Sequence, residues 1–273
     1  MHTNYPIILA HGICPFDGIF AALLRWDNGT RDRYHYFKNI RTTLRNHGFE
    51  VFHARVSWAA EMDRRAGELR DEILCMTDQF RKWPRVHIIA HSMGGLDSRW
   101  MIYRYQMDNR VASLTTIGAP HHGTSCADWG LKRSGWLIRA AGIIGLNIRG
   151  FRDLTRDSCA ERNRMMADFE ENNAVCYQTV SGVQPIERIF LPLRPSFRVI
   201  WKNEGENDGL VSLRSSMWKE KYLVAKIDAD HLNQIGWWDR GEAKSGMDRK
   251  SFEKRIQEVY LRIARGLTDP ERE

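Results

Sequence analysis

The sequence has no long apolar run, which excludes a membrane-spanning helix of ordinary length. No stretch of about 18 consecutive apolar residues occurs in the chain, although a spanning helix needs that length. The longest apolar stretch, Trp136–Ile148, is interrupted by Arg139. The first residues contain no basic segment followed by an apolar one, so no signal peptide is predicted. We expect a cytoplasmic location, or an extracellular one if a signal peptide has been removed.

Cysteine is also scarce. The five cysteines are scattered along the chain, and no Cys-x-x-Cys pair occurs. This spacing excludes a cysteine-based metal site and argues against a disulfide scaffold. We therefore predict a reducing compartment, and neither a metal nor a cofactor for the chemistry.

Charge of one sign does not dominate any segment. The net charge is +7, but Lys and Arg alternate with Asp and Glu along the whole chain. This favours a solvated basic surface over a nucleic-acid site, and no nucleic-acid-binding fingerprint is present. A length of 273 residues with 42% hydrophobic and 27% charged residues indicates one globular domain over residues 1–273.

Strand-like and helix-like segments alternate along the chain. Buried apolar runs predict strands, and apolar residues three and four apart predict helices with one apolar face. The predicted strands cover residues 5–10, 51–56, 86–90, 112–117, 176–181 and 197–201, and the clearest helices cover 62–80 and 252–263. This order favours an α/β fold with a mostly parallel sheet and crossover helices. Residues 127–170 break the rhythm, which indicates an insertion between core elements.

The most informative segment is Ala90-His91-Ser92-Met93-Gly94, which follows a buried strand and precedes a helical pattern. Small residues stand two positions before and two positions after the serine. This pattern is typical of a sharp strand-to-helix turn that exposes a nucleophilic serine, because a bulky neighbour would not fit. The alternative is a serine in an ordinary strand-helix turn. We predict that Ser92 is the nucleophile.

A serine nucleophile needs a histidine base. In the fold that carries this turn, the chain order is serine, acid, histidine. His121 and His122 follow Ser92 too closely for an acid-bearing segment to lie between them. His231 comes much later and is therefore the predicted general base.

The acid should lie at the end of a strand between Ser92 and His231. Asp208 fits best, because it lies in the loop after the predicted strand 197–201. Glu204 and Glu206 are rivals in the same loop. Asp228 and Asp230 are less favoured, because they are too close in sequence to His231.

Two backbone amides should stabilise the oxyanion. The amide of Met93 lies at the start of a helix, and the amide of Ile13 follows Gly12 in the loop after the first strand. His11 is predicted to fix this loop by hydrogen bonding rather than to act in catalysis.

At these residues the sequence resembles bacterial triacylglycerol lipases of the pseudomonad type, which are α/β-hydrolases. The similar blocks are residues 5–13, 90–95, 117–124 and 207–211, and they follow the order found in the family. The resemblance implies an α/β-hydrolase fold with helices on both faces of a mostly parallel sheet. It also implies carboxylic ester hydrolysis through an acyl-enzyme, with Ser92 as nucleophile, Asp208 as acid and His231 as base, and with the amides of Ile13 and Met93 forming the oxyanion hole.

The resemblance further implies a helical lid, here at about residues 127–165. Within it Trp129, Trp136, Leu137 and Ile144 are the expected substrate or lid contacts, and the alternative is an ordinary core-facing helix. Secreted members often hold a structural Ca²⁺ near the catalytic histidine, but Asn233 replaces the aspartate of that site. A Ca²⁺ site is therefore possible but not predicted.

The expected substrate is an ester or lipid, taken up in solution or at a lipid–water interface. Two other functions use the same residues. An acyltransferase or thioesterase would use the same triad with another acceptor or acyl donor, and a non-catalytic α/β-hydrolase-fold protein would bind without turnover. The last is disfavoured because such proteins typically lose one member of the triad.

Overall fold

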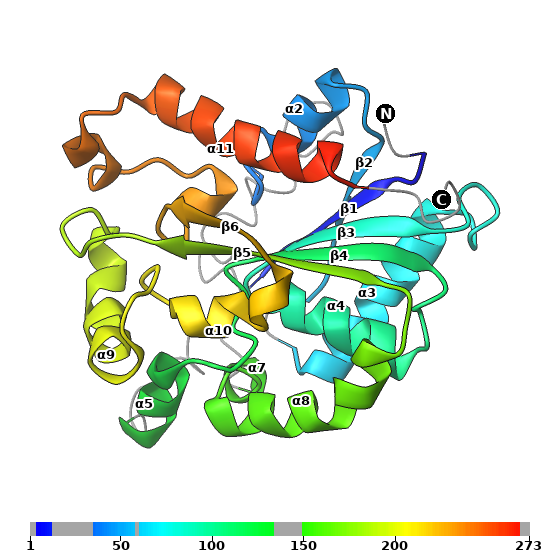
Figure 1. Ribbon diagram of the computed structural model, residues 1–273, viewed down its shortest axis with the longest axis horizontal. Coiled ribbons are helices and arrows are strands. Elements are labelled where there is room, and N and C mark those ends of the chain that lie inside the picture. Colours follow the sequence, from blue (N-terminus) through cyan, green and yellow to red (C-terminus); the bar gives the residue numbers. More distant parts are fainter. Residues whose placement is uncertain (1–3, 13–34, 58–59, 134–148, 268–273) are drawn as a thin grey trace.

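The computed structural model describes residues 4–12, 35–57, 60–133 and 149–267. Its centre is a six-stranded sheet in the order β2-β1-β3-β4-β5-β6, in which every neighbouring pair is parallel (Figure 1). The strands are β1 (Ile7–Ala10), β2 (Val51–Ala54), β3 (Val86–His91), β4 (Val111–Ile117), β5 (Cys176–Val183) and β6 (Leu223–Asp228). All residues of β1, β3 and β4 are buried, as expected for central strands covered on both faces.

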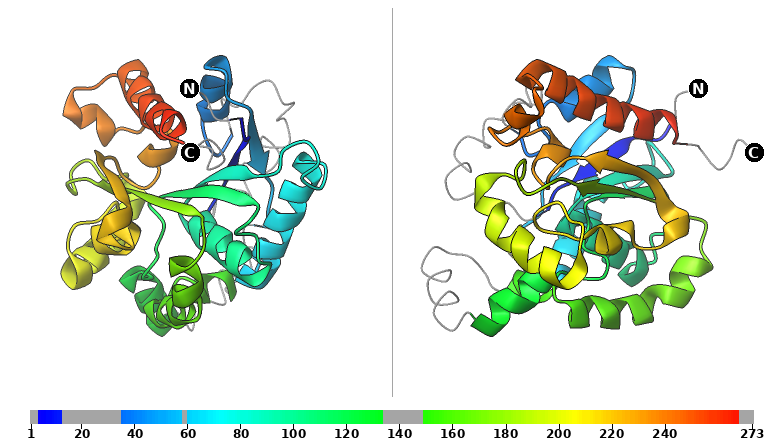
Figure 2. Two further views of the ribbon diagram at one scale, coloured as in Figure 1. Left: turned by 45° about the vertical axis from the view of Figure 1, so that its right-hand side comes forward. Right: turned by 60° about the vertical axis from the view of Figure 1, so that its left-hand side comes forward.

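Helices cover both faces of this sheet, which confirms the predicted architecture (Figure 2). One face carries α2 (Ile40–Asn46) and α11 (Arg249–Arg265), and the other carries α3 (Met62–Met76), α4 (Met93–Arg104) and α8 (Arg156–Glu171). The remaining helices are α5 (Ser125–Arg133), α7 (Arg149–Arg152), α9 (Arg194–Glu204) and α10 (Leu213–Met217). Helix α10 packs on β5, and α5 contacts α7, α8 and α9. Each face has its own apolar core, so the sheet is the shared wall between two packed layers.

Apolar periodicity accounts for the two long helices that the sequence predicted. In α3 the buried residues Met62, Ala66, Leu69 and Ile73 form one stripe, and the helix ends before Phe80. In α11 the stripe continues through Tyr260. The helix begins after Asp248, whose side chain accepts a hydrogen bond from the amide of Ser251, and this cap satisfies an otherwise unpaired amide.

The predicted strand at residues 197–201 is wrong, because this segment belongs to α9. Its β-branched and aromatic residues favour a strand by composition. However, the buried side chains are Phe197 and Ile200, three residues apart, whereas Trp201 is 56% exposed. This is the spacing of one helix face, and Pro195 in the first turn suits a helix start. The sheet-edge strand β6, whose burial alternates along its length, was not predicted from the sequence.

Helix α8 is held on α4 by the buried side chain of Arg99. Its guanidinium pairs with Glu170 at 2.8 Å, donates to Asn163 Oδ1 at 2.9 Å and lies 3.9 Å from the ring centre of Trp218. The insertion predicted at 127–165 therefore includes part of a helix that is packed on the core. Its middle, residues 134–148, lies outside the described residues, so its role as a lid stays a prediction.

A buried ion cluster joins α3, α4 and the loop before α8. Arg65 contacts both carboxylate oxygens of Asp97 through Nε, at 3.0 and 2.9 Å, and its Nη2 donates to Oδ1 at 2.8 Å. Asp153 accepts from Arg65 Nη1 at 3.4 Å and from the amide of Met62 at 3.0 Å. Arg65 and Asp97 are almost completely buried, so either charge is stable only while the other is present.

We expect Asp97→Ala to lower the free energy of unfolding by about 3–5 kcal/mol, because it leaves the Arg65 charge buried with only Asp153 beside it. Urea unfolding measures this loss. The control is Glu258→Ala, which breaks an exposed pair with Arg265 and should cost less than about 1 kcal/mol. Equal losses in the two variants would contradict a structural role for the cluster.

Candidate active site

Ser92 lies between the last residue of β3 and the first residue of α4. Its backbone has φ 56° and ψ −130°, a combination that costs a non-glycine residue about 1–3 kcal/mol. Two hydrogen bonds hold it there. The Ser92 amide donates to Ile117 O at 2.9 Å, and Ser92 O accepts from the amide of Gly95 at 3.0 Å. The serine is therefore fixed at the carboxyl end of β3, next to the carboxyl end of β4.

Close backbone packing explains the small residues around the serine. A Cβ at Gly94 would lie 2.7 Å from Ala10 O, and a Cβ at Gly12 would lie 2.7 Å from the Cβ of Ser92. Neither approach is possible for a larger residue without a backbone shift. The turn after β3 and the loop after β1 can therefore pack together only with glycine at both positions.

The three residues selected by chain order meet in the structure. His231 Nε2 lies 2.8 Å from Ser92 Oγ, and His231 Nδ1 lies 2.8 Å from Asp208 Oδ2. The side chains of His231 and Asp208 are 4% and 1% exposed, whereas Ser92 is partly exposed. A continuous hydrogen-bond path thus leads from a buried carboxylate to an accessible hydroxyl.

The carboxylate of Asp208 is held by its own loop. Oδ1 accepts hydrogen bonds from the amides of Leu210 at 2.9 Å and Val211 at 2.8 Å, and Asp208 O accepts from the amide of His231 at 2.9 Å. The loop that carries Asp208 follows helix α9. The prediction that it follows a strand at residues 197–201 is wrong. This loop returns to the end of β5, where the amide of Gln184 donates to Asn207 O at 3.4 Å.

His231 is held by the preceding residue, Asp230. One carboxylate oxygen accepts from the amides of Leu232 and Asn233 at 2.9 and 2.8 Å, and the other accepts from the amide of Phe190 at 2.8 Å. Burial raises the pKa of Asp230 to about 7, although the Asn233 and Phe190 amides oppose this shift. Asp230 fixes the loop of the histidine and is not a partner of its ring.

Two residues next to the triad, His91 and Tyr36, have contacts that were not predicted from the sequence. The His91 ring lies 4.6 Å from the His231 ring, and its Nδ1 lies 2.7 Å from the Tyr36 hydroxyl. Burial holds the pKa of His91 well below its ordinary value, so the ring is neutral and adds no positive charge beside His231. In the sequence, only the position of His91 directly before Ser92 indicated that it lies close to the triad.

The two other histidines that follow Ser92, His121 and His122, have hydrogen-bond partners outside the triad. His121 lies between Thr116 Oγ1 at 2.8 Å and Arg99 Nη1 at 3.1 Å, and burial together with Arg99 lowers its pKa far below the ordinary value. His122 donates to Trp218 O at 2.8 Å.

The other acidic residues of the Asp208 loop also have partners of their own. Glu204 accepts from the amide of Ser125 at 2.7 Å and from the hydroxyl of Ser212 at 2.6 Å. Glu206 pairs with Lys226 at 3.0 Å. These contacts leave Asp208 as the acid of this loop that reaches His231.

The structure describes one of the two predicted oxyanion-hole residues. Met93 is buried and is the first residue of α4, where helix amides have no acceptor within the helix. Ile13 lies outside the described residues. His11 Nε2 accepts a hydrogen bond from the amide of Val56 at 3.3 Å, in agreement with a role in fixing the loop.

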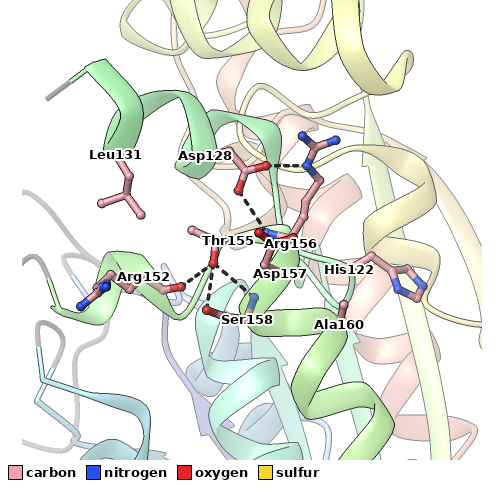
Figure 3. A pocket seen from close by; sticks show the side chains of 9 residues that line it. All are labelled: His122, Asp128, Leu131, Arg152, Thr155, Arg156, Asp157, Ser158 and Ala160. Atoms are coloured by element: carbon pink, nitrogen blue, oxygen red, sulfur yellow. Dashed lines mark hydrogen bonds and ion pairs between the residues drawn. The ribbon is translucent and has the colours of Figure 1, made fainter.

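Of the predicted lid contacts, Trp129 is described, and it is 40% exposed on α5. Trp136, Leu137 and Ile144 lie outside the described residues. A pocket of about 710 Å³ lies between α5, α7 and the start of α8 (Figure 3). Its lining consists of His122, Asp128, Leu131, Arg152, Thr155, Arg156, Asp157, Ser158 and Ala160. Ser92, His231 and Asp208 are not among these residues, and most of the lining side chains are polar or charged.

Comparison with known proteins supports the family suggested by the sequence. Residues 61–133 match the model of the PGAP1-like alpha/beta domain. The chain is 26% identical to a triacylglycerol lipase of Pseudomonas fragi, over 89% of this chain and 92% of that protein. It is 24% identical to a lipase of Staphylococcus epidermidis, over 92% of this chain and 50% of that protein, so it spans about half the length of that relative.

The solved structures give the same fold. The crystal structure of Staphylococcus hyicus lipase superposes with a TM-score of 0.61 at 19% identity, over 96% of both chains. The chain is therefore similar in sequence to bacterial triacylglycerol lipases, and its six-stranded parallel sheet between two helical layers is the fold of the solved lipase structures.

Proposed function

We propose that this protein hydrolyses carboxylic esters through an acyl-enzyme on Ser92. The observation that carries the proposal is the hydrogen-bond path Ser92–His231–Asp208, with 2.8 Å at each step. The Ser92 hydroxyl donates its proton to His231 Nε2 as the oxygen attacks the ester carbonyl. Asp208 accepts the Nδ1 proton of His231, which orients the ring and stabilises the imidazolium that forms.

The tetrahedral intermediate carries a negative oxygen, which needs donors that are already in place. The amide of Met93 is proposed as one donor and the amide of Ile13 as the second. His231 then returns its proton to the alkoxide leaving group, and the acyl-enzyme remains. A water that gives a proton to His231 attacks this ester, and the acid product leaves as Ser92 regains its proton.

The proposed substrate is a lipid ester presented at an interface, as the names of the lipase relatives suggest. Trp129 and Phe151 are each 40% exposed. They lie on neighbouring helices, since a Cβ at Gly130 of α5 would lie 3.6 Å from the Phe151 ring of α7. Two large, partly exposed apolar side chains on neighbouring helices suit contact with a lipid phase. In the described part of the chain no helix is long and apolar enough to cross a membrane.

A Ca²⁺ ion does not fit the residues at the position where the secreted relatives were expected to hold one. The side-chain nitrogen of Asn233 donates to Trp237 O at 2.8 Å and to Asp239 Oδ2 at 3.1 Å. Asn233 thus presents amide hydrogens rather than an oxygen to these two acceptors, and these hydrogens lie where a cation shared by the two oxygens would have to bind. The described residues also contain no group of three or more His, Cys, Asp or Glu side chains that could hold a metal. We therefore propose that hydrogen bonds alone hold the loop after His231.

The first prediction concerns the nucleophile. Ser92→Ala should lower kcat for p-nitrophenyl butyrate by about 10⁴-fold or more, because no acyl-enzyme can form. Ser98→Ala is the matched control, since its hydroxyl is buried on α4 and bonds Gly94 O at 2.7 Å. A folded wild-type protein without turnover of any ester would favour the non-catalytic binding protein. Faster transfer to an added alcohol than to water would favour the acyltransferase, and preference for thioesters would favour the thioesterase.

The second prediction concerns the interface. Trp129→Ala should reduce hydrolysis of an emulsified long-chain triglyceride several-fold, because the variant loses apolar contact with the lipid phase. The rate on soluble p-nitrophenyl butyrate should stay within about twofold, since Trp129 is absent from the triad contacts. Equal losses on both substrates would contradict an interfacial role for this side chain.

The third prediction concerns calcium. The melting temperature and the esterase rate should be the same in EDTA and in millimolar Ca²⁺, because a ligand that binds the native state would raise the melting temperature. Asn233→Asp should lower the melting temperature in EDTA, since it removes two donated hydrogen bonds and places a carboxylate opposite Asp239. Loss of wild-type stability in EDTA, restored by Ca²⁺, would overturn the assignment.

A further inference from the structure

Gln234 contacts the carboxylate oxygen of Asp208 that the amides of the Asp208 loop do not bind. This glutamine is completely buried in a short 3-10 turn, three residues after His231. Its Nε2 donates to Asp208 Oδ2 at 2.7 Å, and the same oxygen accepts from His231 Nδ1. Each oxygen of Asp208 therefore accepts two hydrogen bonds, and Gln234 supplies the one that is neither backbone nor triad.

The amide of Gln234 occupies a slot between the ends of two neighbouring strands. Gly118 directly follows β4, and Gly182 lies near the end of β5. A Cβ at Gly118 would fall closer to Gln234 Oε1 than the 3.0 Å that real Cβ atoms keep, and a Cβ at Gly182 would do the same to Nε2. Both strand ends therefore have to be glycine for this side chain to reach Asp208.

The backbone of Gln234 is anchored independently of the triad. Its amide donates to Asp230 O at 3.1 Å, and its carbonyl oxygen accepts from the Tyr260 hydroxyl of α11 at 3.0 Å. Its position therefore comes from the packing of α11 on the sheet, and the side chain is directed at Asp208 from a rigid base.

The other end of the Gln234 amide is poorly satisfied. Oε1 is buried and accepts no hydrogen bond within the described part of the chain. An unpaired buried oxygen destabilises the folded state, so an apolar side chain of similar size would stabilise the fold more. The orientation with nitrogen towards the carboxylate is the one that makes an attractive contact. Gln234 therefore leaves Oε1 unpaired and places the Nε2 donor against Asp208 Oδ2.

We infer that Gln234 is a positioning residue for the proposed hydrolysis, on which this inference rests. Its N–H group holds Oδ2 of Asp208 towards His231 Nδ1 and prevents the carboxylate from rotating away. With Nδ1 kept as the donor, Nε2 remains the acceptor that faces Ser92. The titratable groups around this amide are Asp208, His231, Asp230 and Tyr260.

Gln234→Met tests the donor, because methionine fills a similar volume and cannot donate. We expect kcat for p-nitrophenyl butyrate to fall about tenfold with KM changed less than about twofold, since a lost hydrogen bond to a charged group has an effect of this size. The acidic limb of the kcat/KM profile should move to higher pH. A side chain that only fills space would leave both kcat and the profile unchanged.

Gln234→Glu tests whether residue 234 has to donate a hydrogen bond to Asp208 Oδ2. A carboxyl beside Asp208 Oδ2 can keep the contact only while it carries a proton, because two adjacent carboxylates do not both ionise readily. This variant should be close to wild type in mildly acidic buffer and should lose activity progressively as the pH rises. The wild-type protein has no carboxyl at residue 234 and should not show this loss. A wild-type profile in Gln234→Glu would contradict the inference.

Gln184→Met is the matched control. Gln184 is buried, and its Nε2 donates to the buried carboxylate of Glu242 at 2.7 Å. The chemistry of the contact is the same, but the carboxylate is not in the triad. We expect a lower melting temperature with kcat within about twofold of wild type.

A fluorophosphonate probe separates failure of this inference from failure of the proposed function. The probe measures the fraction of protein with a reactive Ser92, and all rates are expressed per labelled molecule, so that partly unfolded protein does not count. Wild type without labelling or turnover would reject the hydrolase itself. Wild type with both, and Gln234→Met with unchanged kcat and pH profile, would reject the role of Gln234 alone.

Discussion

The close approach of four strand ends is the constraint on which the rest of this structure depends. The carboxyl ends of β1, β3, β4 and β5 meet at one edge of the sheet. Gly12, Gly94, Gly118 and Gly182 have no room for a Cβ there. Because the backbones are so close, the serine, the acid, the histidine and the glutamine behind the acid can share one small volume. Larger residues at these positions would separate the strand ends and with them the reacting groups.

Two buried arginines are paired with carboxylates away from Ser92, His231 and Asp208. Arg65 and Arg99 are paired within the layer of α3, α4 and α8 and fix those helices to one another. Next to the triad, His91 is neutral because it is buried. The carboxylate of Asp208 therefore acts mainly on His231, without a buried cation competing for it among the contacts described.

Chain order predicted more of the site than local pattern did. His231 could be chosen among ten histidines because the order serine, acid, histidine leaves few candidates, and the three side chains do meet. The segment 197–201 was misread, because its β-branched residues favour a strand while its burial follows a helix. The choice of Asp208 rested on that strand and on the place of its loop between Ser92 and His231, and only the second reason holds, since the loop follows α9. Gln234 could not be predicted, since its contact exists only when β4 and β5 lie side by side, and glycine at 118 and 182 was the single trace of it in the sequence.

The left-handed backbone of Ser92 has a cost that falls on the whole chain. Unfolding releases this torsional strain, so the residue at the centre of the site favours the denatured ensemble. A glycine in its place would relax the turn, and the folded protein would become harder to melt as it lost its hydroxyl. The proposed role of Ser92 as the nucleophile would account for a residue whose backbone conformation lowers the stability of the fold.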